Sequence, residues 1–428
     1  MFKKLSITLL YCIIFLLPTQ LGYFFFFQFS YLSGVRTDYL APCLYLTDLL
    51  ITTLIILNFK LILKKIRIKP YLFILIFLIL NITFSIAPFI SLYRSLKIIE
   101  MLFFYLIIKE LRISPIFTLF LFFTSSFTQL VIAIFQMKEQ QSLQGIFYWF
   151  GERYHSISTP GIATVTLQGV NILRPYGTFS HPNSLAGFYL FLYFFLMIIQ
   201  FSNKKLDHIE QQLFVNPFHY FSQFVKQTSK DHIIFLFLKY GTMLICMLLI
   251  FLSFSKIAIG TFVVLNVVAL WKTRKEIPCK VCITSRFLIL ITMALVFTSA
   301  QGDRATINKR VELAKHTITV ITSHPLVGSG LGTNVLALSK FDSIHPNFFG
   351  QPVHNIILLW ISDAGILGIV ILGWILFAMK EKLFVMTKSP HLYLILVVLI
   401  SGFFDHYWYT LQQNMLIITI LFGIAKKY

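Results

Sequence analysis

The sequence predicts an all-α, polytopic membrane helix bundle with about 12 transmembrane helices and two long outer loops that contain short helices. Composition is the first reason. Of the 428 residues, 57% are hydrophobic and 12% are charged, whereas soluble domains carry about 25% charged residues. A soluble fold of this length could not bury so much apolar surface, but a bilayer can cover it. We therefore expect residues 1–428 to form a single integral membrane domain.

The length of the apolar runs is the second reason, because a membrane-spanning helix needs roughly 20 apolar residues. Runs that meet or approach this length lie near 5–27, 40–59, 71–88, 90–108, 115–136, 184–202, 233–252, 257–271, 285–301, 355–379, 391–404 and 414–425. The first run has no clear small-x-small cleavage site and further runs follow it. We therefore expect a helix there and not a cleaved signal peptide.

The positions of the basic residues are the third reason. Lysine and arginine cluster before the first run and after every second run, ending with Lys426 and Lys427. Such clusters mark the cytoplasmic side of a membrane protein, so both termini are predicted to be cytoplasmic. The net charge of +20 is thereby explained without nucleic acid as a partner. The lipid bilayer is the predicted surrounding.

Two long segments then fall on the outer side, near 137–183 and 302–354. Connections longer than about 15 residues are usually functional or disordered. Both segments contain Phe, Arg and His together with Gly and Pro, and the first also contains Trp and Tyr. No clear internal repeat is present, so an inverted-repeat transporter gains no support. Cys279 and Cys282 form half a zinc site without a second pair nearby. We expect no metal and no cofactor.

The first outer segment ends in a turn-rich approach to the membrane that carries Arg174, His181 and Asn183. Arg174 is either a site residue or an interfacial anchor whose guanidinium reaches the headgroups. His181 and Asn183 are either site residues or caps of the next helix. The residue types alone leave both interpretations open.

The second outer segment carries Arg310 and a glycine-rich stretch with Gly328 and Gly330. Glycine lets backbone amides approach an anion closely, although a flexible turn is the common alternative. Residues 305–322 fit an amphipathic helix, on which Arg310 is otherwise one solvated charge among several.

His354 and Asn355 stand directly before an apolar run that contains Gly365 and Gly368. A helix beginning at His354 would present its N-terminal amides to the outer interface, which is a natural anion site. The two glycines are expected to let a neighbouring helix come close.

Charged residues also occur within or at the ends of the runs, where they are costly and normally paired. Lys97 and Glu100 are three positions apart and are expected to pair on one helix face. Lys256 is expected at the outer end of its run, where it could meet an anionic ligand. The remaining members of this group are Asp48, Arg94 and Asp363.

These motifs resemble the O-antigen ligase and O-antigen polymerase family of bacterial membrane glycosyltransferases. The most specific is His354-Asn355, nine residues, then Gly365-Ile366-Leu367-Gly368. Arg174 to Ala186 (RPYGTFSHPNSLA) and the run from Arg310 through His324 to Gly330 also resemble family motifs, as do Asp405-His406-Tyr407 and Gln412-Gln413. The resemblance spans most of the chain.

The resemblance implies transfer of a glycan from an undecaprenyl-diphosphate carrier to an acceptor hydroxyl, at the outer face of the bacterial cytoplasmic (inner) membrane. It implies an inverting, metal-independent reaction with His354, Arg174 and Arg310 as catalytic residues. Lys256, His181, Asn183, Asn355, Gly328 and Gly330 are the expected substrate-binding residues. Guanidinium groups suit this chemistry because they grip phosphate oxygens in pairs and stay ionised, and a neutral histidine can accept the hydroxyl proton.

Other functions stay open. Within the family, a ligase uses a lipid or protein acceptor, whereas a polymerase extends another lipid-linked glycan, and the His-Asn motif favours the ligase. Outside it, a lipid-linked glycan flippase or transporter predicts charges across the whole membrane depth, and a non-catalytic assembly protein leaves the three motif residues unexplained. The sugar, the acceptor, the oligomeric state and the presence of an outer membrane in the host are not encoded by these patterns.

Overall fold

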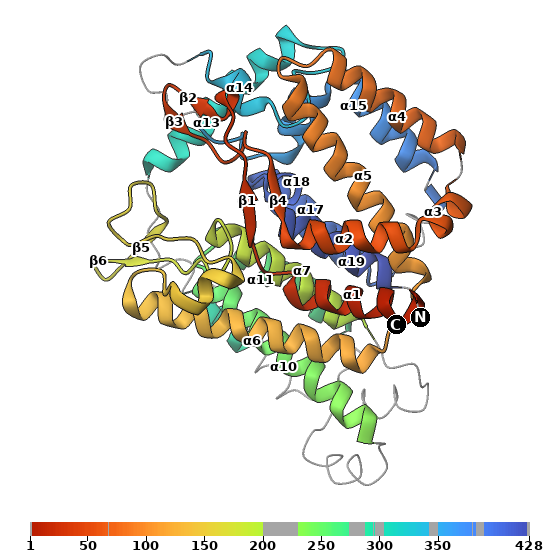
Figure 1. Cartoon of the computed structure of the whole chain (residues 1–428). Helices are drawn as coiled ribbons and strands as arrows, with labels where there is room; N and C mark the ends of the chain where they lie inside the picture. The colour runs from red at the N-terminus through yellow and green to blue at the C-terminus, as the bar shows by residue number, and fades with distance from the viewer. Residues whose placement is uncertain are drawn as a thin grey trace. The chain divides into compact units, whose positions relative to one another are not determined.

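The computed structural model of the protein is mostly helical, with three small two-stranded sheets (Figure 1). It describes residues 2–66, 68–199, 230–273, 287–293, 295, 304–341, 350–378, 380–381 and 389–425. The chain divides into two compact units, each assembled from separate stretches of sequence. Unit 1 comprises residues 1–10, 21–111 and 303–419, and unit 2 comprises 11–20, 112–302 and 420–428. The expectation of a single membrane domain over the whole chain stays a prediction.

A helix lies in each predicted apolar run that the structure describes. These helices are α1 (Phe2–Leu16), α2 (Leu46–Leu57), α4 (Ile68–Thr83), α5 (Pro88–Glu110), α6 (Pro115–Glu139), α7 (Pro182–Ile198), α10 (Lys230–Leu252), α11 (Lys256–Thr273), α15 (Ile356–Ala378), α17 (Leu392–Phe404) and α19 (Gln412–Ile424). The predicted run at 285–301 lies largely outside the described residues. The expectation of a mostly helical protein is thus confirmed, while the bundle of about 12 membrane spans stays a prediction.

Among the described residues, three helices are long and apolar enough to cross a membrane by themselves, namely α6, α10 and α15. A fourth candidate is the bent pair of α2 and α3 (Phe59–Lys65), whose axes differ by 73°. Several further apolar helices are shorter than 18 residues. These helices support a multi-pass membrane protein.

The first predicted span, 5–27, is wrong in its C-terminal part. Helix α1 ends at Leu16, shortly before Pro18, which lacks a backbone donor and restricts the residue that precedes it. The chain then becomes extended: β1 (Gly22–Phe24) pairs with β4 (Cys43–Tyr45), and β2 (Tyr31–Leu32) pairs with β3 (Val35–Arg36). The phenylalanine-rich stretch is therefore a connection between helices, although its composition matches that of a span.

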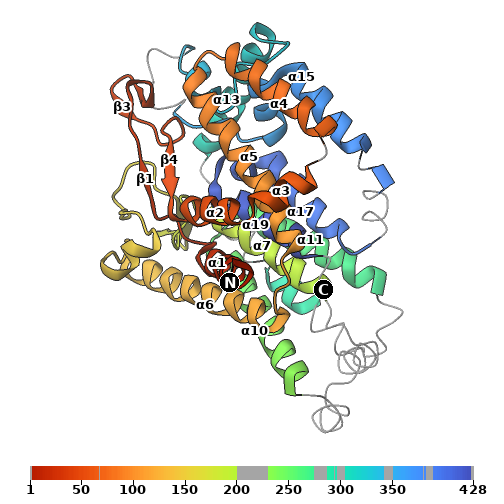
Figure 2. The same cartoon turned by 45° about the vertical axis from the view of Figure 1, so that its right-hand side comes forward.

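Within unit 1, α4 packs against α5 and α15, and both cartoon views show α4 and α15 side by side (Figures 1 and 2). The predicted ion pair on α5 is confirmed, with Lys97 Nζ 3.4 Å from Glu100 Oε2. Asp48 of α2 joins the same buried lysine, which the spacing did not predict. This buried triad joins α2 to α5, as expected for charges that are removed from water.

Unit 2 is built on α6, which packs along α10, while α10 also packs against α7 (Figure 1). The segment at 137–183, which is predicted to be an outer loop, was expected to contain short helices. It contains one 3₁₀ helix, η2 (Gly145–Phe150), followed by a β-hairpin of β5 (Thr164–Leu167) and β6 (Val170–Leu173). The hairpin turn consists of Gln168 and Gly169, both with positive φ, as two-residue hairpin turns require.

The second predicted outer loop, at 302–354, matches its expected secondary structure more closely. The amphipathic helix expected at 305–322 is confirmed as α13 (Arg304–Ser323), and a short helix, α14 (Asn334–Leu338), follows it. Buried apolar side chains of both helices form one cluster, which consists of Leu313 and Val320 of α13 and Ala337 and Leu338 of α14. The Cys279–Cys282 motif lies outside the described residues.

Helix α15 is broken at Gly365, where φ is 63° and ψ is −163°, a conformation available essentially only to glycine. The sequence predicted that this glycine lets a neighbouring helix approach, but the segment that approaches is the loop through Leu326 and Gly328. A Cβ on Gly365 would lie 2.5 Å from the Gly328 nitrogen and 2.5 Å from the Leu326 oxygen. The loop also accepts hydrogen bonds from the freed amides of Ile366 and Leu367.

We expect Gly365→Ala to destabilise the protein by about 1–3 kcal/mol, because alanine is strained at this φ and ψ and its methyl group would push the loop away. Gly373→Ala on the same helix is the matched control, since a Cβ there meets nothing within 4 Å. Thermal unfolding of the detergent-solubilised protein checks both variants. Equal transition temperatures for the two would show that the close approach at Gly365 is unimportant.

Candidate active site

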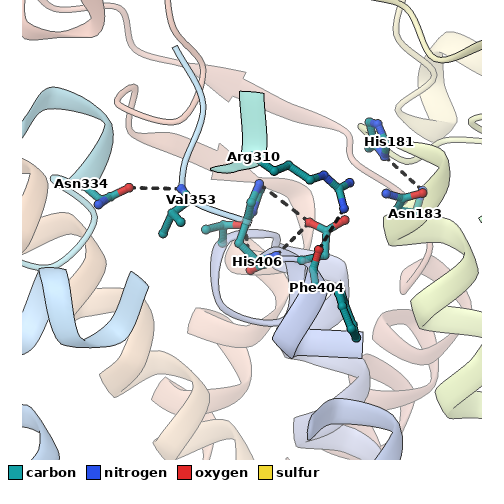
Figure 3. A network of polar contacts seen from close by, with 9 residues as sticks. His181, Asn183, Arg310, Asn334, Val353, Phe404 and His406 are labelled. Atoms are coloured by element: carbon teal, nitrogen blue, oxygen red, sulfur yellow. Dashed lines mark hydrogen bonds and ion pairs between the residues drawn. The ribbon is translucent and has the colours of Figure 1, made fainter. Parts of the chain in front are cut away.

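Hydrogen bonds of two asparagines hold the backbone around His354, immediately before α15. Asn355 caps the helix, and its Oδ1 accepts hydrogen bonds from the amides of Ile357 (2.9 Å) and Leu358 (3.0 Å). On the other side, the amide of Val353 donates to Asn334 Oδ1 at 3.2 Å, as Figure 3 shows. The backbone on both sides of His354 is therefore fixed. The helix begins at Ile356, two residues later than the sequence suggested.

Asp363 of α15 connects Asn334, which holds the segment before His354, to the glycine-rich loop. Its carboxylate accepts hydrogen bonds from the amides of Gly332 (2.8 Å) and Asn334 (3.1 Å) and from the hydroxyl of Tyr409 (3.1 Å). Asp363 is fully buried, so these donors offset the cost of removing a carboxylate from water. The sequence marked Asp363 only as a costly membrane charge. In the structure, Asp363 holds α14 and the glycine-rich loop against α15.

Gly328 and Gly330 have positive φ values of 76° and 113°. The Gly328 amide donates to the His324 carbonyl at 3.2 Å, and the Gly330 amide donates to the Asp363 carbonyl at 3.1 Å. The Gly330 amide thus holds the loop on α15, whereas the Gly328 amide bonds within the loop itself. The predicted use of the same glycines in substrate binding stays a prediction.

The turn between α17 and α18 (Tyr407–Thr410) is where Arg310 and His354 come together. Arg310 of α13 reaches this turn, where its Nη1 donates to the Phe404 carbonyl at 3.4 Å (Figure 3). The His354 ring meets the His406 ring edge to face, with centroids 5.2 Å apart. Two predicted catalytic residues, more than 40 positions apart in the sequence, therefore converge on residues 404–406.

Asp405 and His406 are buried at this turn. His406 Nδ1 lies 2.8 Å from Thr410 Oγ1, and its Nε2 lies 3.9 Å from Asp405 Oδ1. Burial lowers the pKa of His406, Asp405 opposes that shift, and the positive charges of Arg310 and Arg94 add to it. Arg94 reaches the area from α5 and donates to the carbonyls of Thr410 and Tyr39, each at 3.3 Å. The site is thus rich in guanidinium groups.

Sequence reasoning named Asp405 and His406 only as part of a family resemblance. A polar pair between two apolar runs was a usable signal, but nothing local linked it to His354. Arg94 was likewise expected only as a membrane charge. Its place beside Thr410 depends on contacts across more than 300 residues of sequence.

The other predicted site residues gather within unit 2. Arg174 Nε donates to the Ser253 carbonyl and its Nη2 donates to Asn183 Oδ1, each at 2.7 Å. His181 caps α7 by accepting a hydrogen bond from the Asn183 amide at 3.1 Å, which Figure 3 also shows. Ser253 belongs to the short link between α10 and α11, and Lys256 is the exposed first residue of α11. Arg174 therefore joins Asn183 to this short link, and Lys256 directly follows the link.

Two glutamines hold the loop that bears Arg174. Gln136 Oε1 accepts hydrogen bonds from the amides of Tyr176 (2.9 Å) and Gly177 (2.8 Å), and Gln129 Oε1 accepts one from Thr178 (3.0 Å). A Cβ on Gly177 would lie 2.5 Å from Gln129 Oε1, so only glycine fits at that position. These glutamines of α6 were not identified from the sequence because they lie within an apolar run.

Comparison with known proteins finds one matching family. Residues 241–373 match the family model described as O-antigen ligase. The match confirms the resemblance recognised in the sequence, and it includes Lys256, Arg310, His354 and both motif glycines. Arg174, His181 and Asn183 precede the matched segment. No curated protein matches the chain.

The O-antigen ligase match supports glycan transfer of this general kind, and with it a glycosyltransferase-like activity. It also supports interaction with a lipid-linked glycan and an acceptor. Together with the apolar helices, it supports a multi-pass membrane protein.

Proposed function

We propose that this protein transfers a glycan from an undecaprenyl-diphosphate carrier to an acceptor hydroxyl at the outer face of the bacterial cytoplasmic membrane, as an O-antigen ligase. The observation that carries the proposal is the convergence of His354 and Arg310 on the turn at residues 404–406, within and beside the segment that matches the family. We further propose an inverting and metal-independent reaction.

In this reaction, His354 accepts the proton of the acceptor hydroxyl. The hydroxyl oxygen forms a bond to the anomeric carbon as the bond between that carbon and the diphosphate oxygen breaks. Attack opposite to the leaving group inverts the anomeric configuration. The diphosphate departs with multiple negative charges and needs no strong acid, so stabilising its charge is the main catalytic requirement.

Arg310 and Arg174 are proposed to bind diphosphate oxygens through paired guanidinium donors. Lys256 adds a positive charge near Arg174, and Asn183 orients the Arg174 guanidinium. His181, Asn355, Gly328 and Gly330 are proposed to contact the substrate or to hold the groups that do. The acceptor is a lipid, glycan or protein hydroxyl.

Deletion of the gene, followed by analysis of lipid-linked and surface glycans, tests this function. We expect long glycan chains to accumulate on the lipid carrier, with normal surface glycan restored by the wild-type gene but not by a His354→Ala copy. Accumulation of single repeats would instead indicate a polymerase of the same family. Loss of surface glycan, with lipid-linked glycan trapped on the cytoplasmic side, would indicate a flippase.

The proposed topology has about 12 transmembrane helices, cytoplasmic termini and both long loops outside. We expect single cysteines at the exposed positions Pro160 and Lys340, in a protein otherwise free of cysteine, to react with an impermeant thiol reagent in intact cells. A cysteine at Lys64 is the matched control, which should react only after permeabilisation. The reverse pattern would overturn the topology.

A further inference from the structure

Three side chains with metal-ligand chemistry meet beside the proposed base. His354 precedes α15, while Asp405 and His406 form the turn between α17 and α18. One ligand atom from each of these residues lies within 4.8 Å of the other two. Asp405 and His406 are buried, and His354 is half-buried. All three belong to unit 1.

The distances suit a transition metal after small side-chain rotations. Zinc binds imidazole nitrogen at about 2.0–2.1 Å and carboxylate oxygen at about 2.0–2.2 Å, so its ligand atoms lie up to roughly 4 Å apart. The Asp405 Oδ1 and His406 Nε2 atoms are already 3.9 Å apart. Two imidazoles with one carboxylate favour Zn²⁺ over Mg²⁺ or Ca²⁺, which prefer oxygen ligands.

The groups behind the ligands are also those expected at a metal site. His406 uses Nδ1 to contact Thr410 Oγ1 at 2.8 Å, which directs Nε2 toward Asp405. Asp405 Oδ1 also accepts a hydrogen bond from the His406 amide at 2.8 Å. Such outer hydrogen bonds orient metal-binding side chains. The Val353 amide, held by Asn334, fixes the backbone that carries His354.

The positive charge of Arg310 opposes a bound cation, because its guanidinium reaches the neighbouring Phe404 carbonyl. A single carboxylate only partly offsets that charge. We therefore expect binding in the micromolar range, which is weaker than at structural zinc sites. Three protein ligands also leave a fourth position open.

From this geometry we propose that His354, Asp405 and His406 form a Zn²⁺ site, and that bound Zn²⁺ inhibits glycan transfer. The inhibitory part rests on the proposed function: the ring nitrogen of His354 that coordinates Zn²⁺ cannot also accept the acceptor proton. The binding part depends only on the three ligands. Transfer itself needs no metal in this scheme.

The test uses the full chain in detergent with Cys279 and Cys282 changed to serine, so that the cysteine pair cannot bind Zn²⁺. Competition with a fluorescent zinc chelator measures affinity, and X-ray absorption identifies the ligands. We expect nitrogen and oxygen neighbours at about 2.0–2.1 Å and no binding of Mg²⁺. His406→Gln and Asp405→Asn should each weaken Zn²⁺ binding at least about tenfold.

His316→Gln is the matched control, because His316 lies on α13 of the same unit and pairs with Glu312 at the surface. It should leave Zn²⁺ affinity unchanged. Thermal unfolding verifies that each variant is folded, and a loss of affinity in either folded ligand variant is sufficient. Equal affinity in the wild type and both ligand variants, or no Zn²⁺ binding at all, overturns the site.

Transfer is then measured with Zn²⁺ and with a chelator. We expect Zn²⁺ to inhibit the wild type reversibly and to inhibit His406→Gln at least about tenfold less strongly. Restoration of activity by Zn²⁺ after chelation would overturn the inhibitory proposal, since the metal would then be required. Absence of transfer under every condition would refute the proposed function, while the binding measurements would still decide the metal site.

Discussion

Replacing His354 with alanine should lower the rate of glycan transfer by about 10²–10⁴-fold, the usual contribution of a general base. The change removes the only group that we propose to accept the acceptor proton. It should leave the fold intact, because Asn355 still caps α15 and Asn334 still holds the Val353 amide. Transfer from lipid-linked glycan by purified protein, at saturating donor and acceptor, measures the effect.

The control for this change is His316→Gln, which removes a surface histidine of the same unit. It should transfer glycan at the wild-type rate. His354→Gln separates proton transfer from simple contact, since glutamine retains a polar group but is not a base. A wild-type rate in either His354 variant, with the protein folded, would exclude His354 as the base.

The helices of this protein were predictable because a membrane imposes a strong local rule: long apolar runs become helices. The rule failed where composition and backbone chemistry disagree. Residues 22–27 are as apolar as a span, but Pro18 ends the preceding helix and Gly22 and its neighbours pair with β4. A sliding average of hydropathy does not register a single proline.

The motif glycines illustrate a second limit. Their spacing predicted a close approach, and a close approach occurs at Gly365. The predicted partner, a neighbouring helix, was wrong. That prediction assumed an unbroken helix, whereas α15 is broken at Gly365. The path of the loop through Gly328 explains why residue 365 is glycine, whereas a Cβ on Gly368 would lie 2.3 Å from Ala364 of α15 itself.

The candidate site was predictable in its residue types but not in its surroundings. His354 and Arg310 could be chosen because imidazole and guanidinium fit transfer from a diphosphate. Their meeting point at Phe404, Asp405 and His406 could not be derived, since it depends on contacts between residues 52 and 94 positions apart. The same holds for Asn334, whose contact with Val353 has no local signature.

Arg310→Lys should lower kcat/KM by about 10²-fold, comparable to the loss of one donor that stabilises developing charge. Lysine retains the positive charge and can still donate to the Phe404 carbonyl, but it cannot offer two parallel donors to a diphosphate. Arg174→Lys should cost at least as much, because Arg174 also bridges the Ser253 carbonyl and Asn183 Oδ1. Initial rates over a range of donor concentrations measure both effects.

The matched control is Arg112→Lys, an exposed arginine on the predicted cytoplasmic side, which should have no effect. If the guanidinium groups stabilise the departing diphosphate, kcat falls along with kcat/KM, whereas an effect on KM alone indicates ground-state binding. Wild-type kinetics in both lysine variants would refute the requirement for paired donors.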